Sequence, residues 1–260
     1  MELTLYHIDA FASKPFEGNP AAICPLDNWL PDSLMQSIAT ENNLSETAYF
    51  VATDKGYHIR WFTPLREVDL CGHATLASAY VIFNILGYQK DEILFDSKSG
   101  VLAVQQKGDL LELDFPSQIP VACAVPEQIR KAIQAKPAEC LKAADYIVVV
   151  EDEASVINAN PDMALLSQLD LRGVAITAKS REYDFVVRFF SPKHGIGEDP
   201  VTGSVFTQLI PYWSDKLGKK QLRAKQVSAR GGEVECLLAG DRVKISGRAV
   251  EYLVGTIYIK

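Results

Sequence analysis

Short stretches in which apolar and polar residues alternate open the chain. Residues 3–10 alternate in this way and predict a strand, and residues 16–20 (Phe-Glu-Gly-Asn-Pro) have the composition of a turn. A short helix is predicted to begin near Pro31, because proline suits a first helical turn, and to end before Asn42. Residues 46–51 and 58–62 then predict a pair of strands.

Two longer segments follow a different pattern. Residues 74–86 carry almost no charge on any face, and Gly87 follows them as a residue suited to a helix end. A helix that is apolar all round is a buried helix, so we expect a central core helix over 73–87. A second, mostly apolar helix is predicted over 203–217. Short strands are expected after each helix.

The two halves of the chain repeat the same order of elements. Gly72 and Gly203 each open an apolar helix, and Gly100 and Gly231 each follow after 28 positions. A Gly-Asp turn comes next in both halves, at 108–109 and 240–241. We interpret this agreement as a duplication, with a first half-domain over 1–116 and a second over 117–260. The half to which the last strand (252–260) belongs is left open.

The starts of the two apolar helices suggest a binding site. Residues 71–74 (Cys-Gly-His-Ala) and 202–205 (Thr-Gly-Ser-Val) are turns whose backbone N–H groups lie at the positive end of a helix dipole. Two such ends between the half-domains would bind a substrate carboxylate without lysine, metal or nucleotide. The simpler alternative is that each glycine only makes a tight turn.

Charge and composition exclude several classes of function. A net charge of −7 and a pI near 5.2 argue against binding to nucleic acid or to an anionic membrane. No apolar run reaches the length of about 18 residues that a membrane span needs. The five cysteines are odd in number and have no CxxC spacing, and no signal peptide is evident, so we expect the reducing cytoplasm.

Cofactors also lack support in the sequence. No GxGxxG follows a predicted strand, and the glycines near residue 200 lack the lysine of a phosphate loop. Cys71 and His73 are two residues apart, but no second ligand pair at a usable spacing completes a zinc site. We therefore expect neither cofactor nor metal.

Three titratable residues are candidates for proton chemistry. Glu46 lies beside an apolar run, where desolvation would raise its pKa toward that of a general acid or base; a solvated strand end is the alternative. His73 lies at a predicted helix start, which favours a neutral imidazole over an imidazolium, or it is purely structural. Asp199 precedes the second helix, where a capping role is the strong alternative.

Seven motifs run in order through nearly the whole chain and resemble the PhzF-like (phenazine biosynthesis) isomerase family. They are residues 9–11 (DAF), 16–22 (FEGNPAA), 43–47 (NLSET), 60–64 (RWFTP), 71–75 (CGHAT), 198–204 (EDPVTGS) and 228–232 (SARGG). Residues 117–180 match only loosely.

This resemblance implies an α/β fold like that of diaminopimelate epimerase. In it, two pseudo-symmetric halves each curl a mixed sheet around one central helix. It also implies a homodimer and cofactor-free proton transfer, with Glu46 as the proton carrier and His73, Asp199 and Ser204 as its helpers. The implied substrate-binding residues are Asn19, Gly72, His73, Ala74, Thr202, Gly203 and Ser204.

The chain departs from related epimerases at one of their two catalytic cysteines. Cys71 matches the first, but Thr202 occupies the second position, and a hydroxyl is not a base near neutral pH. Val205-Phe206 also replaces the usual Ala-His, which suggests a more apolar wall. We therefore expect a proton-shift isomerase for a small carboxylate-bearing substrate. An epimerase or racemase using Glu46 with Cys71 or Asp199, and a non-catalytic binding protein, are the alternatives.

Overall fold

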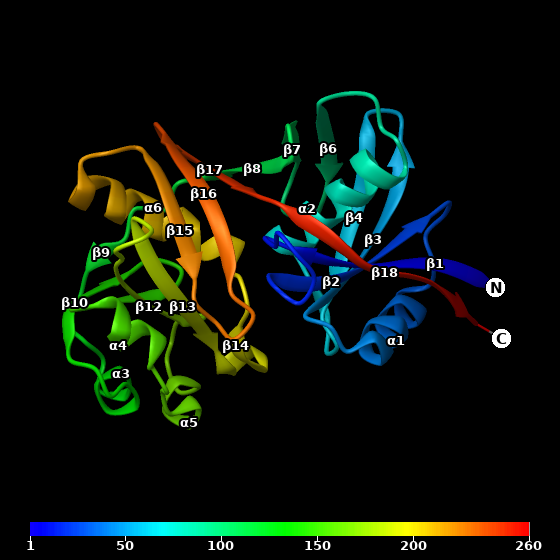
Figure 1. Cartoon of the computed structure of the whole chain (residues 1–260). Coiled ribbons are helices and arrows are strands. Elements are labelled where there is room, and N and C mark those ends of the chain that lie inside the picture. Colours follow the sequence, from blue (N-terminus) through cyan, green and yellow to red (C-terminus); the bar gives the residue numbers. More distant parts are fainter. Residues whose placement is uncertain (260) are drawn as a thin grey trace. The chain divides into compact units, whose positions relative to one another are not determined.

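The computed structural model describes residues 1–259 and divides the chain into two compact units (Figure 1). Unit 1 comprises Met1–Asp114 together with the segment from Ser246 onward, and unit 2 comprises Phe115–Ile245. The division falls two residues before the boundary expected at 116. The last strand, β18 (Ala249–Tyr258), belongs to unit 1, where it pairs antiparallel with the whole of β1 (Glu2–Ala10).

Unit 1 is a mixed sheet in which each parallel pair of strands is joined through a helix. β1 pairs antiparallel with β2, β2 pairs parallel with β3 through α1, and β4 pairs parallel with β6 through α2. The other elements of this unit are β2 (Asn19–Leu26), α1 (Asp32–Asn42), β3 (Glu46–Thr53), β4 (Gly56–Phe62), β5 (Glu67–Val68), α2 (Gly72–Tyr80), β6 (Glu92–Asp96), β7 (Leu102–Lys107) and β8 (Leu110–Pro116), of which the last two residues are counted in unit 2.

The central helix of unit 1 is shorter than the expected 73–87. It is α-helical over Gly72–Tyr80, continues as a π-helical turn over Val81–Ile85, and Gly87 beyond it has a φ of +71°. Every residue from His73 to Ala79 is buried, and the helix packs against β1, β2, β3 and β18. The hydroxyls of Thr75 and Ser78 donate to carbonyls one turn earlier, so these polar groups are satisfied within the core.

Unit 2 repeats this plan with different helices. β11 pairs parallel with β12, and β13 pairs parallel with β15 through α6 (Gly203–Leu217), whose bounds equal the expected range. The other elements are β9 (Val121–Ala122), α3 (Glu127–Ala132), β10 (Pro137–Lys142), β11 (Tyr146–Val150), α4 (Glu153–Ile157), α5 (Met163–Leu166), β12 (Val174–Lys179), β13 (Phe185–Ser191), a short 3₁₀ turn (Pro192–His194), β14 (Ile196–Asp199), β15 (Gln221–Gln226), β16 (Gly232–Ala239) and β17 (Arg242–Gly247).

Glycines at equivalent positions mark the repeat in the backbone. Gly87 and Gly218 end the two central helices and lie 131 positions apart, which is also the separation of Gly100 and Gly231. All four have a φ between +66° and +92°, a region that residues with a side chain rarely enter. In both units three strands follow the helix in the same order, β6–β8 and β15–β17. The duplicated elements therefore share turn geometry as well as sequence spacing.

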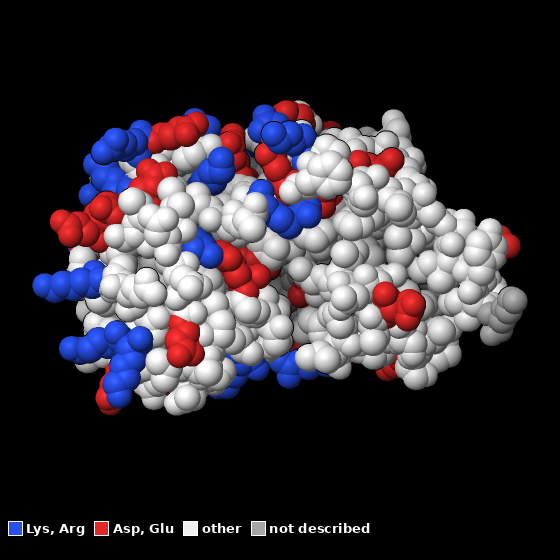
Figure 2. All heavy atoms as spheres, turned by 60° about the horizontal axis from the view of Figure 1, so that its bottom comes forward, with Lys and Arg blue, Asp and Glu red and all other residues white. Residues whose placement is uncertain are grey.

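The face drawn in Figure 2 carries charges of both signs. On the face drawn in Figure 2, lysine and arginine side chains are interspersed with aspartate and glutamate. Within residues 1–259, no helix is long and apolar enough to cross a membrane.

Candidate functional site

The candidate groups of unit 1 come from the first residues of three neighbouring elements. Asn19 begins β2, Glu46 begins β3, and His73 lies in the first turn of α2. The parallel register of β2 and β3 sets Ala21 opposite Glu46, which brings the starts of both strands to the same edge. All three polar side chains are buried, and Glu46 is only 8% exposed. The fold thus gathers polar groups that are 54 residues apart in sequence.

Gly18 gives the chain its approach to this edge. Its φ is +66°, and a Cβ at this position would lie 2.1 Å from the carbonyl oxygen of Ala10. Any other residue would push β2 away from β1 at the point where Asn19 enters the site. The glycine of residues 16–20 therefore serves a close backbone approach as well as a turn.

His73 lies at the centre of the unit 1 cluster. Its Nε2 is 3.0 Å from Oε2 of Glu46, and its Nδ1 is 3.2 Å from the amide nitrogen of Asn19 and 3.5 Å from Sγ of Cys71. With the amide nitrogen of Asn19 donating to Nδ1, the ring proton lies on Nε2, the nitrogen that faces Glu46. A half-turn of the Asn19 amide would present its oxygen to a protonated Nδ1 instead. Asn19 can therefore accompany both protonation states of His73.

The surroundings of His73 favour its protonated state more than its position at a helix start suggests. Burial lowers the pKa of His73, but charge on Cys71 and Glu46 and hydrogen bonds from both raise it, and the net direction is upward. The Cys71 thiol is neutral near pH 7, because burial raises its pKa to about 11. With the thiol neutral, the Glu46 carboxylate 3.0 Å from Nε2 is the neighbour that favours the imidazolium.

Glu46, Cys71 and His73 also have donor atoms that could surround a metal ion, all lying within 4.8 Å of one another. The two other residues, however, face opposite nitrogens of the imidazole, Glu46 facing Nε2 and Cys71 facing Nδ1. A metal ion binds one nitrogen of an imidazole, so an ion on either ring nitrogen would lie on the side away from one of the two other residues. The donor set fits proton transfer better than metal binding.

The candidate groups of unit 2 gather at the start of α6. Thr202 is the N-cap residue, and its hydroxyl donates to Asp199 Oδ2 at 2.6 Å. The buried amide of Gln226 accepts from the Thr202 N–H at 2.9 Å and donates to the Asp199 carbonyl at 2.6 Å. Asp199 is thus bonded to the N-cap side chain. Gly203 follows in the first turn of the helix, beside Ser204.

An arginine beside Ser204 is the group that motif analysis missed. Arg172 donates two hydrogen bonds to the fully buried carboxylate of Asp145 and one to the hydroxyl of Ser204. Arg172 and Asp145 lie in the region where the family resemblance is loose. The available signal was an aspartate directly before the wholly apolar strand β11, a position where a charge requires a partner.

Val205 and Phe206 were expected to form an apolar wall of the substrate site, but they lie in the core. Val205 and Phe206 are both fully buried, and the ring of Phe206 lies 6.2 Å from that of Phe185. Their bulk is therefore part of the core of unit 2, beneath α6.

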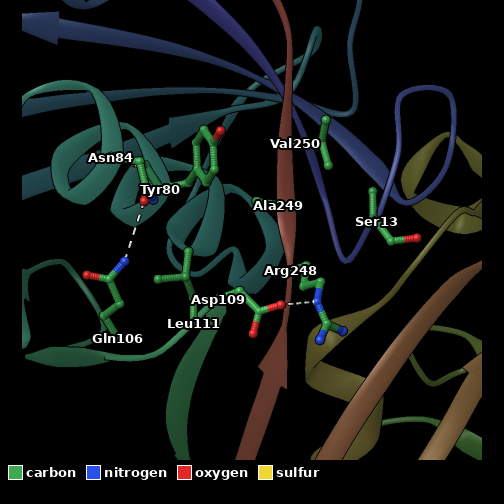
Figure 3. Close-up of a pocket in the computed structure, with 10 residues that line it drawn as sticks. Ser13, Tyr80, Asn84, Gln106, Asp109, Leu111, Arg248, Ala249 and Val250 are labelled. Carbon is green, nitrogen blue, oxygen red and sulfur yellow. Dashed lines mark hydrogen bonds and ion pairs between the residues drawn. The ribbon is translucent and has the colours of Figure 1, made fainter.

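Unit 1 also has a hollow of about 200 Å³ that involves none of the expected site residues (Figure 3). It lies between the end of α2, the β7–β8 turn and the start of β18. Arg248 and Asp109 form an ion pair at its rim with a distance of 2.6 Å, and Tyr80 and Asn84 line the opposite side. Both charged groups are largely exposed, so this hollow offers no desolvated acid or base.

Comparison with known proteins identifies the family of this chain. The model of the family described as "Phenazine biosynthesis-like protein" matches residues 8–255. A protein of Pseudomonas aeruginosa named as an uncharacterized isomerase is 52% identical over 100% of both chains, and a second from the same organism is 48% identical over 99% of both. The crystal structure of a PhzF-family protein from Enterococcus faecalis has a TM-score of 0.98 at 45% identity, covering 100% of both chains.

More distant structures share only the fold. A hydroxyproline epimerase from Agrobacterium vitis has a TM-score of 0.62 at 10% identity, covering 98% of this chain and 92% of that one. The α/β fold of two similar halves is therefore the one shared by PhzF proteins and such epimerases. The chain belongs to the phenazine biosynthesis-like (PhzF) family and is an enzyme of the isomerase class.

Proposed function

We propose that the protein is a cofactor-independent isomerase that moves a proton between carbons of a small carboxylate-bearing substrate, with Glu46 as the carrier. The observation that carries this proposal is the contact of 3.0 Å between the buried Glu46 carboxylate and His73 Nε2. A buried carboxylate in contact with a single imidazole can hold a proton briefly and return it. Asp199 and Ser204 contribute to the same reaction by binding and orienting the substrate.

The proposed proton path uses groups of this chain alone. Glu46 removes a proton from a carbon made acidic by conjugation, and the proton then resides on the carboxyl group. His73 stabilises the carboxylate before and after this step through its Nε2–H. Glu46 then returns the proton to a different carbon on the same face of the substrate. The N-terminal N–H groups of α2 (Gly72 to Ala74) and of α6 (Thr202 to Ser204), with Asn19, are proposed to bind the substrate.

The raised pKa of Cys71 supports this isomerase over an epimerase. Epimerisation requires a second base on the opposite face of the carbon, and a thiol with a pKa of about 11 is almost entirely protonated near pH 7. Thr202, at the equivalent position of unit 2, donates its hydroxyl proton to Asp199. Asp199 itself remains the alternative second base.

Proton exchange in D2O tests the proposal. The protein is incubated with a panel of β,γ-unsaturated carboxylates and of L- and D-amino acids, and deuterium uptake is followed by NMR. Transfer between carbons supports the isomerase, whereas exchange at one carbon with inversion indicates an epimerase. Carboxylates that bind without exchange would indicate a binding protein. Undiminished exchange by Glu46→Gln would show that another group is the base.

Homodimer formation and a cytoplasmic location are part of the same proposal. Several large side chains of β18 are exposed, among them Tyr252, Val254 and Tyr258, and a second copy would cover such a surface. All five cysteines are free thiols in the structure, in keeping with a reducing compartment. Light scattering of the purified protein tests the dimer, and cell fractionation tests the location.

A further inference from the structure

The guanidinium of Arg172 is held in one orientation by a buried carboxylate. Its Nε and Nη2 donate to the two oxygens of Asp145 at 2.8 and 2.5 Å, and its Nη1 donates to Ser204 Oγ at 2.9 Å. Two parallel bonds to one carboxylate fix the plane of the guanidinium, which a lysine ammonium cannot do. The third bond therefore reaches Ser204 from a fixed direction.

Asp145 is itself held from two sides. The Gln208 amide of α6 donates to Asp145 Oδ2 at 2.7 Å, and the backbone N–H of Asp145 donates to Gln208 Oε1 at 3.0 Å. Both residues have no exposed surface, whereas 37% of the Arg172 side chain remains exposed. The arrangement connects the interior of unit 2 to the first turn of α6, with the arginine at its outer end.

The bond from Arg172 determines what Ser204 can do. The hydroxyl oxygen accepts from Arg172, and its proton has no acceptor among the described residues of unit 2. A positive group bonded to the oxygen draws electrons from the O–H bond and makes its proton a better donor. That proton is then available to an anion at the start of α6. Burial lowers the pKa of Arg172, but Asp145 and Asp199 raise it by more than burial lowers it, so the guanidinium remains charged.

We propose that Arg172 is a positioning residue that, anchored by Asp145 and Gln208, orients the Ser204 hydroxyl as a donor to the carboxylate of the substrate. This inference deepens the proposed function, because it takes from it only that a carboxylate binds at the start of α6. It does not depend on which group transfers the proton. Arg172 acts through Ser204 and need not touch the substrate.

A double-mutant cycle on ligand binding tests this role separately from catalysis. The probe is benzoate, and its dissociation constant is measured from the shift of the backbone amide at position 204 in NMR spectra of the full chain. Arg172→Lys keeps a positive charge but cannot bridge Asp145 and Ser204 in the same plane. We expect it to weaken benzoate binding roughly fivefold in the native background and less than twofold in Ser204→Ala, where no hydroxyl remains to be oriented.

A double variant and a control distinguish a loss of orientation from a folding defect. Arg172→Gln combined with Asp145→Asn removes both charges together, so no buried carboxylate is left unpaired. The matched control is Arg60→Lys, since Arg60 likewise donates two bonds to one carboxylate, that of Glu67 at 2.7 and 2.9 Å, but lies in unit 1. Arg60→Lys is expected to leave benzoate affinity unchanged.

Three results would overturn the proposal. An equal loss of affinity from Arg172→Lys with and without Ser204→Ala would mean that Arg172 acts on the anion directly or through the fold in general. Unchanged affinity in both Arg172 variants would mean that it has no role in binding. If saturating benzoate caused no shift of the Ser204 amide in the native protein, no carboxylate would bind at the start of α6. Failure of the isomerase proposal appears separately, as absence of deuterium transfer by a protein that still binds benzoate through this coupled pair.

Discussion

The two units carry different chemistry at equivalent helix starts. In unit 1, Cys71 and His73 flank Gly72, and His73 contacts the buried carboxylate of Glu46. In unit 2, Thr202 and Ser204 flank Gly203, and their hydroxyls are bonded to Asp199 and Arg172. The first set contains groups that can exchange a proton, and the second contains hydrogen-bond donors in a fixed network. The proposed function assigns proton transfer to the first set and orientation of the substrate to the second.

The largest expected effect is that of removing the proton carrier. Glu46→Gln preserves the shape of the side chain and the contact with His73 but cannot accept a proton from carbon. We expect the exchange rate to fall about 10³-fold, within the range found for general acid–base groups. The rate is measured by deuterium uptake on the substrate found in the panel. Glu67→Gln is the control carboxylate of unit 1, and a similar loss in that variant would contradict a specific role for Glu46.

Stability should depend more on the Asp145 cluster of unit 2 than on the Glu46 cluster of unit 1. Asp145→Asn leaves Arg172 without its charged partner and weakens the bonds to a fully buried group, and we expect a loss of about 2 kcal/mol in the free energy of unfolding, since Arg172 is partly exposed. Glu46→Gln should change it by less than about 1 kcal/mol, because a functional pair contributes little to net stability. Urea unfolding measures both values. The comparison fails if Glu46→Gln is the more destabilising change.

The pH dependence of stability should identify His73. Its pKa is raised in the folded protein, so its contribution to stability is fully present below about pH 6.5, the ordinary value, and is lost as pH rises through the folded value. The native protein should therefore lose stability relative to His73→Gln as pH increases above neutral. Thermal unfolding of both proteins between pH 6 and 10 measures this difference. Parallel curves would show that His73 has an ordinary pKa.

The smallest expected effect is that of Cys71→Ser. The thiol is protonated near pH 7 and lies 3.5 Å from His73 Nδ1, so we expect the exchange rate to change by less than about threefold. The same NMR assay measures it. A loss as large as that of Glu46→Gln would identify Cys71 as a base and favour the epimerase.

The sequence predicted the duplicated elements well because they depend on local pattern and spacing. The apolar segments after Gly72 and Gly203 correspond to α2 and α6, although the pattern could not show that the last third of the first segment is π-helical. That feature depends on how side chains fit the surrounding sheet. The assignment of β18 to unit 1 depends on its pairing with β1, whose residues lie 239 or more positions away from their partners, and no local signal contains such a pairing.

Sequence analysis found the candidate groups that lie in short motifs. It missed those that only the tertiary fold brings together. Glu46, His73, Asp199 and Ser204 lie in short motifs next to glycines. Their roles remain predictions. Arg172 and Asp145 are 27 positions apart in a region without such motifs, and only the fold of unit 2 brings them together. The protonation of His73 also depends on Glu46, which is distant in sequence.

In the proposed reaction, one carboxylate carries the proton from one carbon to another. A substrate deuterated at the donor carbon is converted in ordinary water by the native protein, and the label is followed by NMR during a single turnover. Retention of part of the deuterium at the receiving carbon, abolished by Glu46→Gln, is the predicted result. Complete loss of the label with inversion at the original carbon would contradict the claim and indicate two bases on opposite faces.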